Sequence, residues 1–248
     1  MKPYFQQGAI RIYHGDCREV VGAIDVSNVG CAIADPPYQE TKLKWDRWPE
    51  EWPMAMWVLP TDASLWSFGS LRMFMARAAA FEEWIYGQDV VWEKHNGSNS
   101  AADRFRRVHE LAAQFYRGSW GNVWNQPIKT MDAQRRTVRR TKGRPRHWGE
   151  LGAANYISKD GGPRLMRSVI RVRSEHGRAL HPTQKPIGLV EPLVRSSLAP
   201  GRTLLEPFMG SGTGLVVAKS LGRAAIGIDI NERWCEVAAN RVVQEIGA

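Results

Sequence analysis

A run of apolar residues from Val29 to Ala34 ends abruptly in the tetrapeptide Asp35-Pro36-Pro37-Tyr38. A strand that is apolar at every position is typical of a parallel sheet with helices on both of its faces. The strand is expected to end here, because neither proline has an N–H to donate. Sheets of this kind bind their ligands at the carboxyl ends of the strands. The tetrapeptide therefore stands where a ligand-binding residue is expected.

Further apolar runs alternate with helical stretches along the chain. Strands are predicted at residues 9–13, 65–68, 89–92, 113–116, 203–205 and 224–229, and helices from about residue 18 and at 71–82, 105–112, 189–198, 214–221 and 232–246. This alternation predicts an α/β fold with three layers and a mostly parallel sheet. Residues 39–53 are predicted to form a loop or a short helix, in which Trp45, Trp48 and Trp52 are expected to pack against the protein more than to cover a ligand.

Residues 118–178 lose this periodicity, and we interpret them as an insertion that divides one domain into the halves 1–117 and 179–248. A hydrophobic content of 43% and 11 tryptophans are typical of a globular protein. The sequence has no apolar run long enough for a membrane span and no signal-peptide pattern. Cys17, Cys31 and Cys235 are widely spaced and form no zinc motif. We therefore expect a reduced, cytoplasmic protein without a structural metal.

The insertion carries a cluster of positive charge, in a chain whose formal net charge is +9. No acidic residue interrupts this basic cluster, which consists of Arg135, Arg136, Arg139, Arg140, Lys142, Arg144 and Arg146. Such a cluster is more typical of a surface that contacts phosphates than of an evenly solvated basic face. The sequence therefore predicts that the insertion binds a polyanionic partner.

A second motif, the glycine-rich segment Glu206-Pro-Phe-Met-Gly-Ser-Gly-Thr213, follows the strand at 203–205 and precedes a helix. Gly210 and Gly212 allow the backbone to approach a ligand closely. The segment has neither the glycine spacing of a dinucleotide fold nor the lysine of a P-loop, which disfavours both of those readings. Asp229 ends the next strand, where a carboxylate can hold ribose hydroxyls. The alternative is an ordinary tight turn followed by a surface aspartate.

The order of these motifs resembles that of the S-adenosylmethionine-dependent amino-methyltransferases of DNA. The tetrapeptide precedes the glycine-rich segment and a basic insertion separates them, which is similar to the β class of that family. Residues 13–16, 90–96, 107–110 and 181–186 resemble further elements of the family, the last as His-Pro-Thr-Gln-Lys-Pro. The resemblance implies a Rossmann-like methyltransferase fold. The chain departs from the family's usual Asp, Thr and Glu by having Glu206, Gly214 and Asp229.

The resemblance also implies a role for each motif. Asp35 and the carbonyl of Pro36 would accept the two N–H groups of the target amine, and Tyr38 would stack on the flipped base. The residues implied to bind the cofactor are Glu206, Phe208, Gly210, Gly212 and Thr213 at its methionine end, Asp229 at the ribose, Asp16 and Trp234 near the adenine, and His181, Thr183 and Lys185 at the carboxylate.

The sequence thus predicts a site-specific adenine-N6 methyltransferase of double-stranded DNA, because the family tends to pair Asp at the start of the tetrapeptide with adenine and Ser with cytosine. Cytosine-N4 methylation is the nearest alternative. A catalytically silent DNA-binding protein with the same fold and a methyltransferase of RNA or protein amines are the others. Members of the β class often dimerise, so a homodimer is a further expectation from the resemblance.

Overall fold

The computed structural model describes residues 1–97, 103–143, 152–175 and 177–244. The chain forms two compact units, which we describe separately. The larger unit is Met1–Gln126 with Ser168–Ala248, and the smaller unit is Pro127–Arg167. The smaller unit lies inside the predicted insertion, and residues on both sides of it belong to the larger unit. Arg144 and Arg146 of the basic cluster lie outside the described residues.

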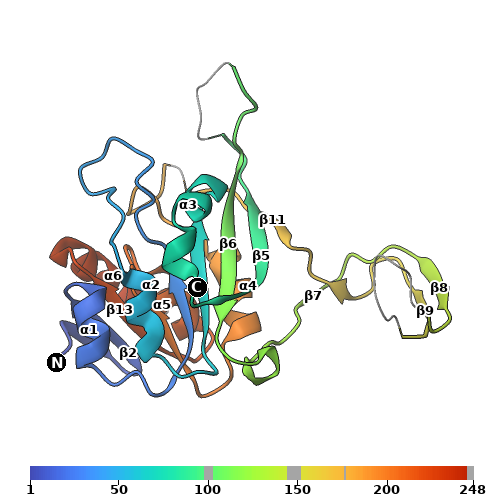
Figure 1. Ribbon diagram of the computed structural model, residues 1–248, viewed down its shortest axis with the longest axis horizontal. Coiled ribbons are helices and arrows are strands. Elements are labelled where there is room, and N and C mark those ends of the chain that lie inside the picture. Colours follow the sequence, from blue (N-terminus) through green and yellow to red (C-terminus); the bar gives the residue numbers. More distant parts are fainter. Residues whose placement is uncertain (98–102, 144–151, 176, 245–248) are drawn as a thin grey trace. The chain divides into compact units, whose positions relative to one another are not determined.

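The larger unit is built on a nine-stranded sheet with the strand order β1-β2-β13-β12-β3-β4-β6-β5-β11 (Figure 1). The strands are β1 (Phe5–Gln7), β2 (Ile10–His14), β3 (Val29–Ala34), β4 (Ser64–Gly69), β5 (Ile85–Glu93), β6 (His109–Tyr116), β11 (Val169–Arg171), β12 (Thr203–Glu206) and β13 (Ala224–Asp229). Strands β2, β13, β12, β3 and β4 are parallel to one another, whereas β1 and β6 run antiparallel to their neighbours. The predicted, mostly parallel sheet is confirmed.

Helices cover both faces of this sheet. They are α1 (Cys17–Ala23), α2 (Trp52–Ala55), α3 (Leu71–Ala76), α4 (Ile187–Ser197), α5 (Thr213–Ser220) and α6 (Glu232–Gln244), with short 3-10 turns at Met56–Val58, Ala78–Phe81 and Trp120–Asn122. Leu65 of β4 lies in the same apolar cluster as Trp52 of α2. Its neighbour Trp66 donates its indole N–H to Ser197 of α4 over 2.8 Å. Successive strand residues point to opposite faces, so α2 and α4 lie on opposite sides and the three layers are confirmed.

The helix predicted at 105–112 is wrong. β6 spans His109–Tyr116 and pairs with β4 on one side and with β5 on the other. Residues 112–115 of β6 are all buried, so this part of the strand lacks the alternation of a half-buried strand, and periodicity cannot separate it from a buried helix. The helix predicted at 71–82 is shorter than expected, because α3 ends at Ala76 and a 3-10 turn follows.

The predicted packing role of the tryptophans is confirmed for two of them. Trp52 is fully buried and Trp48 is 6% exposed, and both belong to the apolar cluster between α1, α2 and the sheet. Trp45 is 46% exposed. No helix among the described residues is long and apolar enough to cross a membrane.

The smaller unit consists of two antiparallel strand pairs. β8 (Arg136–Arg140) pairs with β9 (Ala154–Ser158), and β7 (Lys129–Thr130) pairs with β10 (Arg164–Leu165). Polar contacts connect the pairs to their flanking turns: Asp132 accepts hydrogen bonds from Arg164, and Asp160 accepts one from the backbone N–H of Arg135.

Candidate active site

The tetrapeptide and the glycine-rich segment meet at one edge of the sheet. Strands β3 and β12 are parallel neighbours, with Leu205 opposite Ala32. The tetrapeptide follows β3, the glycine-rich segment follows β12, and both therefore leave the same carboxyl edge. From there the chain continues to β4 on one side and to β13 on the other. Two adjacent strands whose connections diverge in this way mark the position at which α/β sheets bind ligands.

The Asp35 carboxylate, 22% exposed, accepts hydrogen bonds on both oxygens. The Tyr38 hydroxyl donates to Oδ1 over 2.7 Å, and the Lys185 ammonium donates to Oδ2 over 2.6 Å. Burial is the main cause that raises the pKa of Tyr38 well above its ordinary value, and the negative charge of Asp35 is the second, so the phenol keeps its proton. Burial would lower the pKa of Lys185, but the charges of Asp35 and Glu110 outweigh it and the pKa is raised. The site therefore contains a cation held directly on the carboxylate.

The carboxyl group of Glu206 lies at the amino end of α5. Its oxygens accept hydrogen bonds from the N–H groups of Gly214 and Leu215, each over 3.0 Å. Burial raises the pKa of this carboxyl to about 8. Two of the amides that could bind a phosphate at this helix terminus are thus already occupied. The geometry disfavours a phosphate-bearing ligand here, in agreement with the sequence motif.

The glycine-rich turn is tightly fixed. Gly210 and Gly212 have left-handed backbone conformations, with φ of 50° and 72°. A Cβ at Gly212 would come within 2.9 Å of Ala238 in α6, so the turn packs too closely for a side chain. Thr213 is buried, and its hydroxyl donates to the backbone carbonyl of Lys185 over 3.1 Å. Glu206 and Thr213 therefore support the turn from inside the protein.

Asp229 is the last residue of β13, and Asp16 follows the neighbouring strand β2. The Asp229 carboxylate accepts hydrogen bonds from the N–H of Gly210 over 3.0 Å and of Asn231 over 2.8 Å, and burial raises its pKa to about 6. Asp16 caps the amino end of α1 and binds Arg18, whose hydrogen bonds lower the pKa of Asp16. The backbone N–H of Gly15 donates to the carbonyl of Asp229 over 2.9 Å, which joins the two strand ends.

His181 lies beside the glycine-rich turn. Its ring packs edge-on against Trp234, with centroids 4.4 Å apart, and lies 6.1 Å from that of Trp45. A Cβ on Gly210 would lie 3.5 Å from the His181 ring. Thr183, which is exposed, contacts His181 Nδ1 through its hydroxyl over 3.1 Å. Burial lowers the pKa of His181. The structure therefore gathers His181, Trp234 and Gly210 in one place.

Phe208 is partly buried and packs edge-on against Trp52, with centroids 5.3 Å apart. It thus connects the glycine-rich segment to the apolar cluster between α1, α2 and the sheet.

Two residues near Asp35 were not assigned from the sequence. Glu110 of β6 lies 3.6 Å from Lys185 and also binds Lys94, which is 13% exposed. Lys94 is thus largely buried, whereas the next residue, His95, is exposed. Glu110 was hidden by the mistaken helix at 105–112. In the structure, Glu110 lies opposite Trp92 of β5, near the carboxyl edge of the parallel strands.

The described residues of the basic cluster are all exposed: Arg135, Arg136, Arg139, Arg140 and Lys142. Residues paired directly across an antiparallel ribbon share a face. Arg139 with Asn155 and Thr137 with Ile157 are therefore on one face of the β8–β9 ribbon. Arg136 and Arg140 are on the other.

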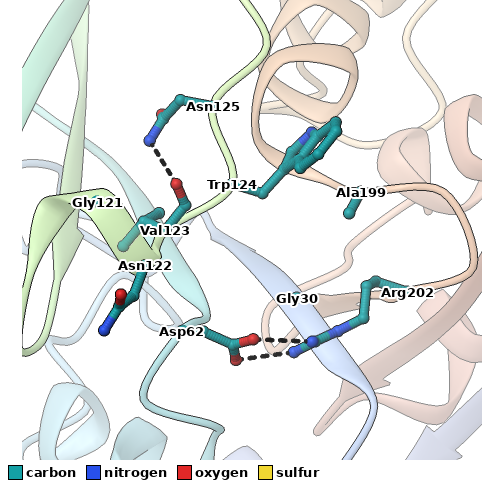
Figure 2. Close-up of a pocket in the computed structure, with 9 residues that line it drawn as sticks. All are labelled: Gly30, Asp62, Gly121, Asn122, Val123, Trp124, Asn125, Ala199 and Arg202. Carbon is teal, nitrogen blue, oxygen red and sulfur yellow. Dashed lines mark hydrogen bonds and ion pairs between the residues drawn. The ribbon is translucent and has the colours of Figure 1, made fainter.

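A cavity of about 370 Å³ lies at the opposite edge of the sheet (Figure 2). Its walls include Gly30 at the start of β3 and Arg202 just before β12, and Arg202 is ion-paired with Asp62 over 2.9 Å. These are the amino ends of the strands, so the cavity is separate from the site at the carboxyl edge. Among the described residues, no group of three or more His, Cys, Asp or Glu side chains is placed to hold a metal ion.

Comparison with known proteins identifies the family. Residues 29–240 match the family model for N6/N4 methyltransferases, described as DNA methylase. Two curated relatives are each 28% identical: the type II methyltransferase M1.MboII of Moraxella bovis, with 95% of this chain and 97% of the relative covered, and M.HinfI of Haemophilus influenzae, with 93% and 67% covered.

Solved structures of similar fold include M1.HpyAVI in complex with S-adenosylmethionine, at 24% identity and a TM-score of 0.63, covering 94% of this chain and 99% of that one. The PvuII DNA methyltransferase, named as cytosine-N4-specific, matches at 14% identity and a TM-score of 0.68, covering 100% of this chain and 91% of that one. The family match runs from β3 into α6 and includes both motifs. The chain belongs to the N6/N4 family of DNA methylases.

Proposed function

We propose that this chain is a site-specific adenine-N6 methyltransferase of double-stranded DNA. The observation that carries the proposal is the meeting of Asp35-Pro36 with the glycine-rich turn at the ends of two adjacent parallel strands. One motif suits the target amine and the other suits the methyl donor, and transfer requires both at the same place.

The cofactor of this family is S-adenosylmethionine, which supplies an electrophilic methyl group on a sulfonium. The residues fit such a molecule. Gly210 and Gly212 offer backbone without side chains, and Asp229 stands at the strand end that suits ribose hydroxyls. His181, Thr183, Trp234 and Asp16 would surround the remainder. Glu206 favours a cofactor without phosphate, because it occupies the amides of α5.

Asp35 and Pro36 would activate the amine by positioning. The amino group of adenine is a poor nucleophile, since its lone pair is delocalised into the ring. Asp35 would accept one N–H and the Pro36 carbonyl the other, which turns the lone pair out of the ring plane toward the methyl group. Tyr38 would support the flipped base, although its hydroxyl is engaged by Asp35. This chemistry depends on geometry and charge, with no covalent intermediate.

Adenine is preferred over cytosine because the tetrapeptide begins with Asp35. The neighbour named as cytosine-N4-specific keeps cytosine as the second candidate. Incubation of duplex DNA with methyl-tritiated S-adenosylmethionine, followed by nucleoside analysis, distinguishes them. The proposal expects N6-methyladenine. Label recovered only as N4-methylcytosine would refute it, and label in RNA or protein alone would move the chain to another substrate class.

The β8–β9 ribbon would contact DNA. A two-stranded ribbon fits the major groove, where Arg pairs with guanine and Asn with adenine. We assign base contacts to the face with Arg139 and Asn155, and phosphate contacts to Arg135, Arg136 and Lys142. Arg140 would contribute less, because its Nε donates to the carbonyl of Gly152 over 3.0 Å. The roles of Arg144 and Arg146 stay predictions.

The curated relatives are bacterial type II methyltransferases. By analogy, we propose that this chain modifies DNA inside a bacterial cell as part of a restriction–modification system. The homodimer stays a prediction, for which size-exclusion chromatography with light scattering is the test.

A further inference from the structure

Lys185 connects the two motifs of the site. Its backbone carbonyl accepts a hydrogen bond from Thr213 of the glycine-rich segment over 3.1 Å. Its ammonium lies 2.6 Å from Oδ2 of Asp35. One residue thus contacts the cofactor turn with its backbone and the catalytic carboxylate with its side chain.

The Lys185 ammonium is enclosed by the protein. The side chain is 8% exposed, and Nζ lies 5.0 Å from the ring of Phe68 and 5.8 Å from the ring of Tyr38. A buried ammonium is unfavourable unless carboxylates offset its charge. Here Asp35 does so at 2.6 Å and Glu110 at 3.6 Å. The ammonium is therefore committed to two protein carboxylates, which leaves it poorly placed to bind the carboxylate of a cofactor.

Glu110 is itself held on the other side. Its Oε1 binds Lys94, and its Oε2 faces Lys185 and has no hydrogen-bond partner of its own among the residues that the structure describes. The charges alternate along a row from Asp35 through Lys185 and Glu110 to Lys94. In such a row, each group restricts the rotamers of the next. Glu110 also shares the ammonium with Asp35, so more of the Asp35 charge is available to an amine that becomes positive as its N–C bond forms.

We propose that Lys185 is a positioning residue for methyl transfer: it fixes the orientation of the Asp35 carboxylate, and Glu110 fixes Lys185. This inference rests on the proposed function and replaces the cofactor-carboxylate role that the sequence suggested for Lys185. The ammonium and the Tyr38 hydroxyl each take one oxygen of Asp35, which locks the rotamer while lone pairs remain for the target amine.

The test compares wild type with Lys185→Met, Lys185→Arg, Glu110→Gln and the double variant K185M/E110Q. The affinity for S-adenosylmethionine is measured by calorimetry without DNA, and the single-turnover transfer rate is measured on a duplex containing the target sequence. Lys219→Met is the control, because Lys219 at the end of α5 contacts Gln7, away from both motifs.

We expect K185M to lower the transfer rate by on the order of 10²-fold while its cofactor affinity changes little. K185R restores part of the rate, because it keeps the charge. E110Q lowers the rate less and adds nothing in the K185M background, because Glu110 acts through Lys185. K219M behaves as wild type.

Two results would overturn the inference. A loss of cofactor affinity as large as the loss of rate would return Lys185 to the cofactor carboxylate, and an undiminished K185M rate would remove any role. If K185M does not fold, the K185R and E110Q variants test the inference instead, again by whether the transfer rate falls while the affinity for S-adenosylmethionine stays the same. Failure of the wild-type chain to methylate adenine refutes the proposed function and is seen before any variant is compared.

Discussion

At Asp35, a single carboxylate makes three kinds of contact. It binds a phenol, binds an ammonium and, in the proposed function, accepts the N–H of the target amine. The strand β3 ends directly before it, so its backbone is fixed by the sheet. A substitution here changes the reacting centre without touching the glycine-rich turn.

Asp35→Ala should therefore abolish transfer and spare the cofactor. We expect the single-turnover rate to fall by about 10²-fold or more, because the amine loses its acceptor, while calorimetry gives a cofactor affinity near that of wild type. Asp62→Ala is a matched control, since Asp62 is also an ion-paired aspartate but lies at the amino edge of the sheet. Turnover retained in D35A would be incompatible with the proposed role.

At the scale of elements, the packing at the amino end of α5 depends on the sizes of two side chains. The family's usual Asp and Thr are replaced by Glu206 and Gly214, a longer carboxylate beside a residue without a side chain. A Cβ on Gly214 would lie 2.5 Å from the Glu206 carboxylate. The two departures from the family thus compensate for each other.

Gly214→Ala should destabilise the protein by about 1–3 kcal/mol through overpacking, although alanine is the better helix former. Glu206→Asp should relieve the crowding, so the double variant loses less than the sum of the single variants. Denaturant unfolding measures both. Gly22→Ala in α1 is the control, because no atom of the described part of the chain lies within 4 Å of the added Cβ and a gain of about 0.4–1 kcal/mol is expected. Additive losses would contradict the compensation.

The β8–β9 ribbon allows base and phosphate contacts to be separated. Arg139→Ala should cost about 1–3 kcal/mol on the target sequence and relax the choice of base at one position. Arg136→Ala on the opposite face should weaken binding to all sequences alike and reduce the slope of log K against log salt by about 1. Fluorescence anisotropy with target and scrambled duplexes at several salt concentrations measures this. The same pattern for both variants would mean that the two faces do not differ.

The elements around the two motifs could be predicted from sequence because local signals define them. Prolines end β3, and a glycine-rich turn separates β12 from α5. Only the second half of β6 could be predicted, as the strand at 113–116, because the pairing of its first half with β4 and β5 is tertiary and has no local signal. Glu110 was lost with it, and so was the ion pair that gives Lys185 its place. The motif identified Lys185 as a site residue but not the group that it binds.

At the scale of the whole molecule, stability should depend on pH through its buried carboxyl groups. Burial raises the folded-state pKa of Glu206 to about 8 and that of Asp229 to about 6. When a carboxyl group has a higher pKa in the folded state than in the unfolded state, its contribution to stability is complete below the unfolded-state pKa. That contribution is lost as pH rises through the folded-state pKa. Burial lowers the folded-state pKa of His181, which has the opposite effect on stability: the contribution of this residue is lost as pH falls below the ordinary pKa of histidine.

Glu206→Gln isolates one of these contributions. Between pH 5 and pH 8.5, the free energy of unfolding of wild type should fall relative to that of E206Q, because only wild type must ionise this buried carboxyl. Denaturant titrations of both proteins across this range measure the difference. A difference that does not vary with pH would show that Glu206 is ionised throughout, as an ordinary helix cap would be.

The two units also differ in what the sequence could predict about them. Charge alone marked the region that contains the smaller unit, because lysine and arginine are visible without a fold. That Arg139 shares a face with Asn155 depends on the register of β8 against β9, and that register has no local sequence signal. The boundary at Pro127 was likewise hidden, because residues 118–126 and 168–178 are irregular in sequence yet belong to the larger unit.

The carboxylate of Glu206 has a consequence for competition between metabolites. ATP and NAD share an adenosine group with the methyl donor, and they differ from it by carrying phosphates. The Glu206 carboxyl already accepts the N–H groups of Gly214 and Leu215 at this helix terminus, so fewer amides remain for those phosphates, and the carboxyl repels them once it ionises. In the proposed function, this arrangement would select the methyl donor from a mixture of adenine nucleotides by excluding the phosphate-bearing ones, without a residue that recognises the sulfonium.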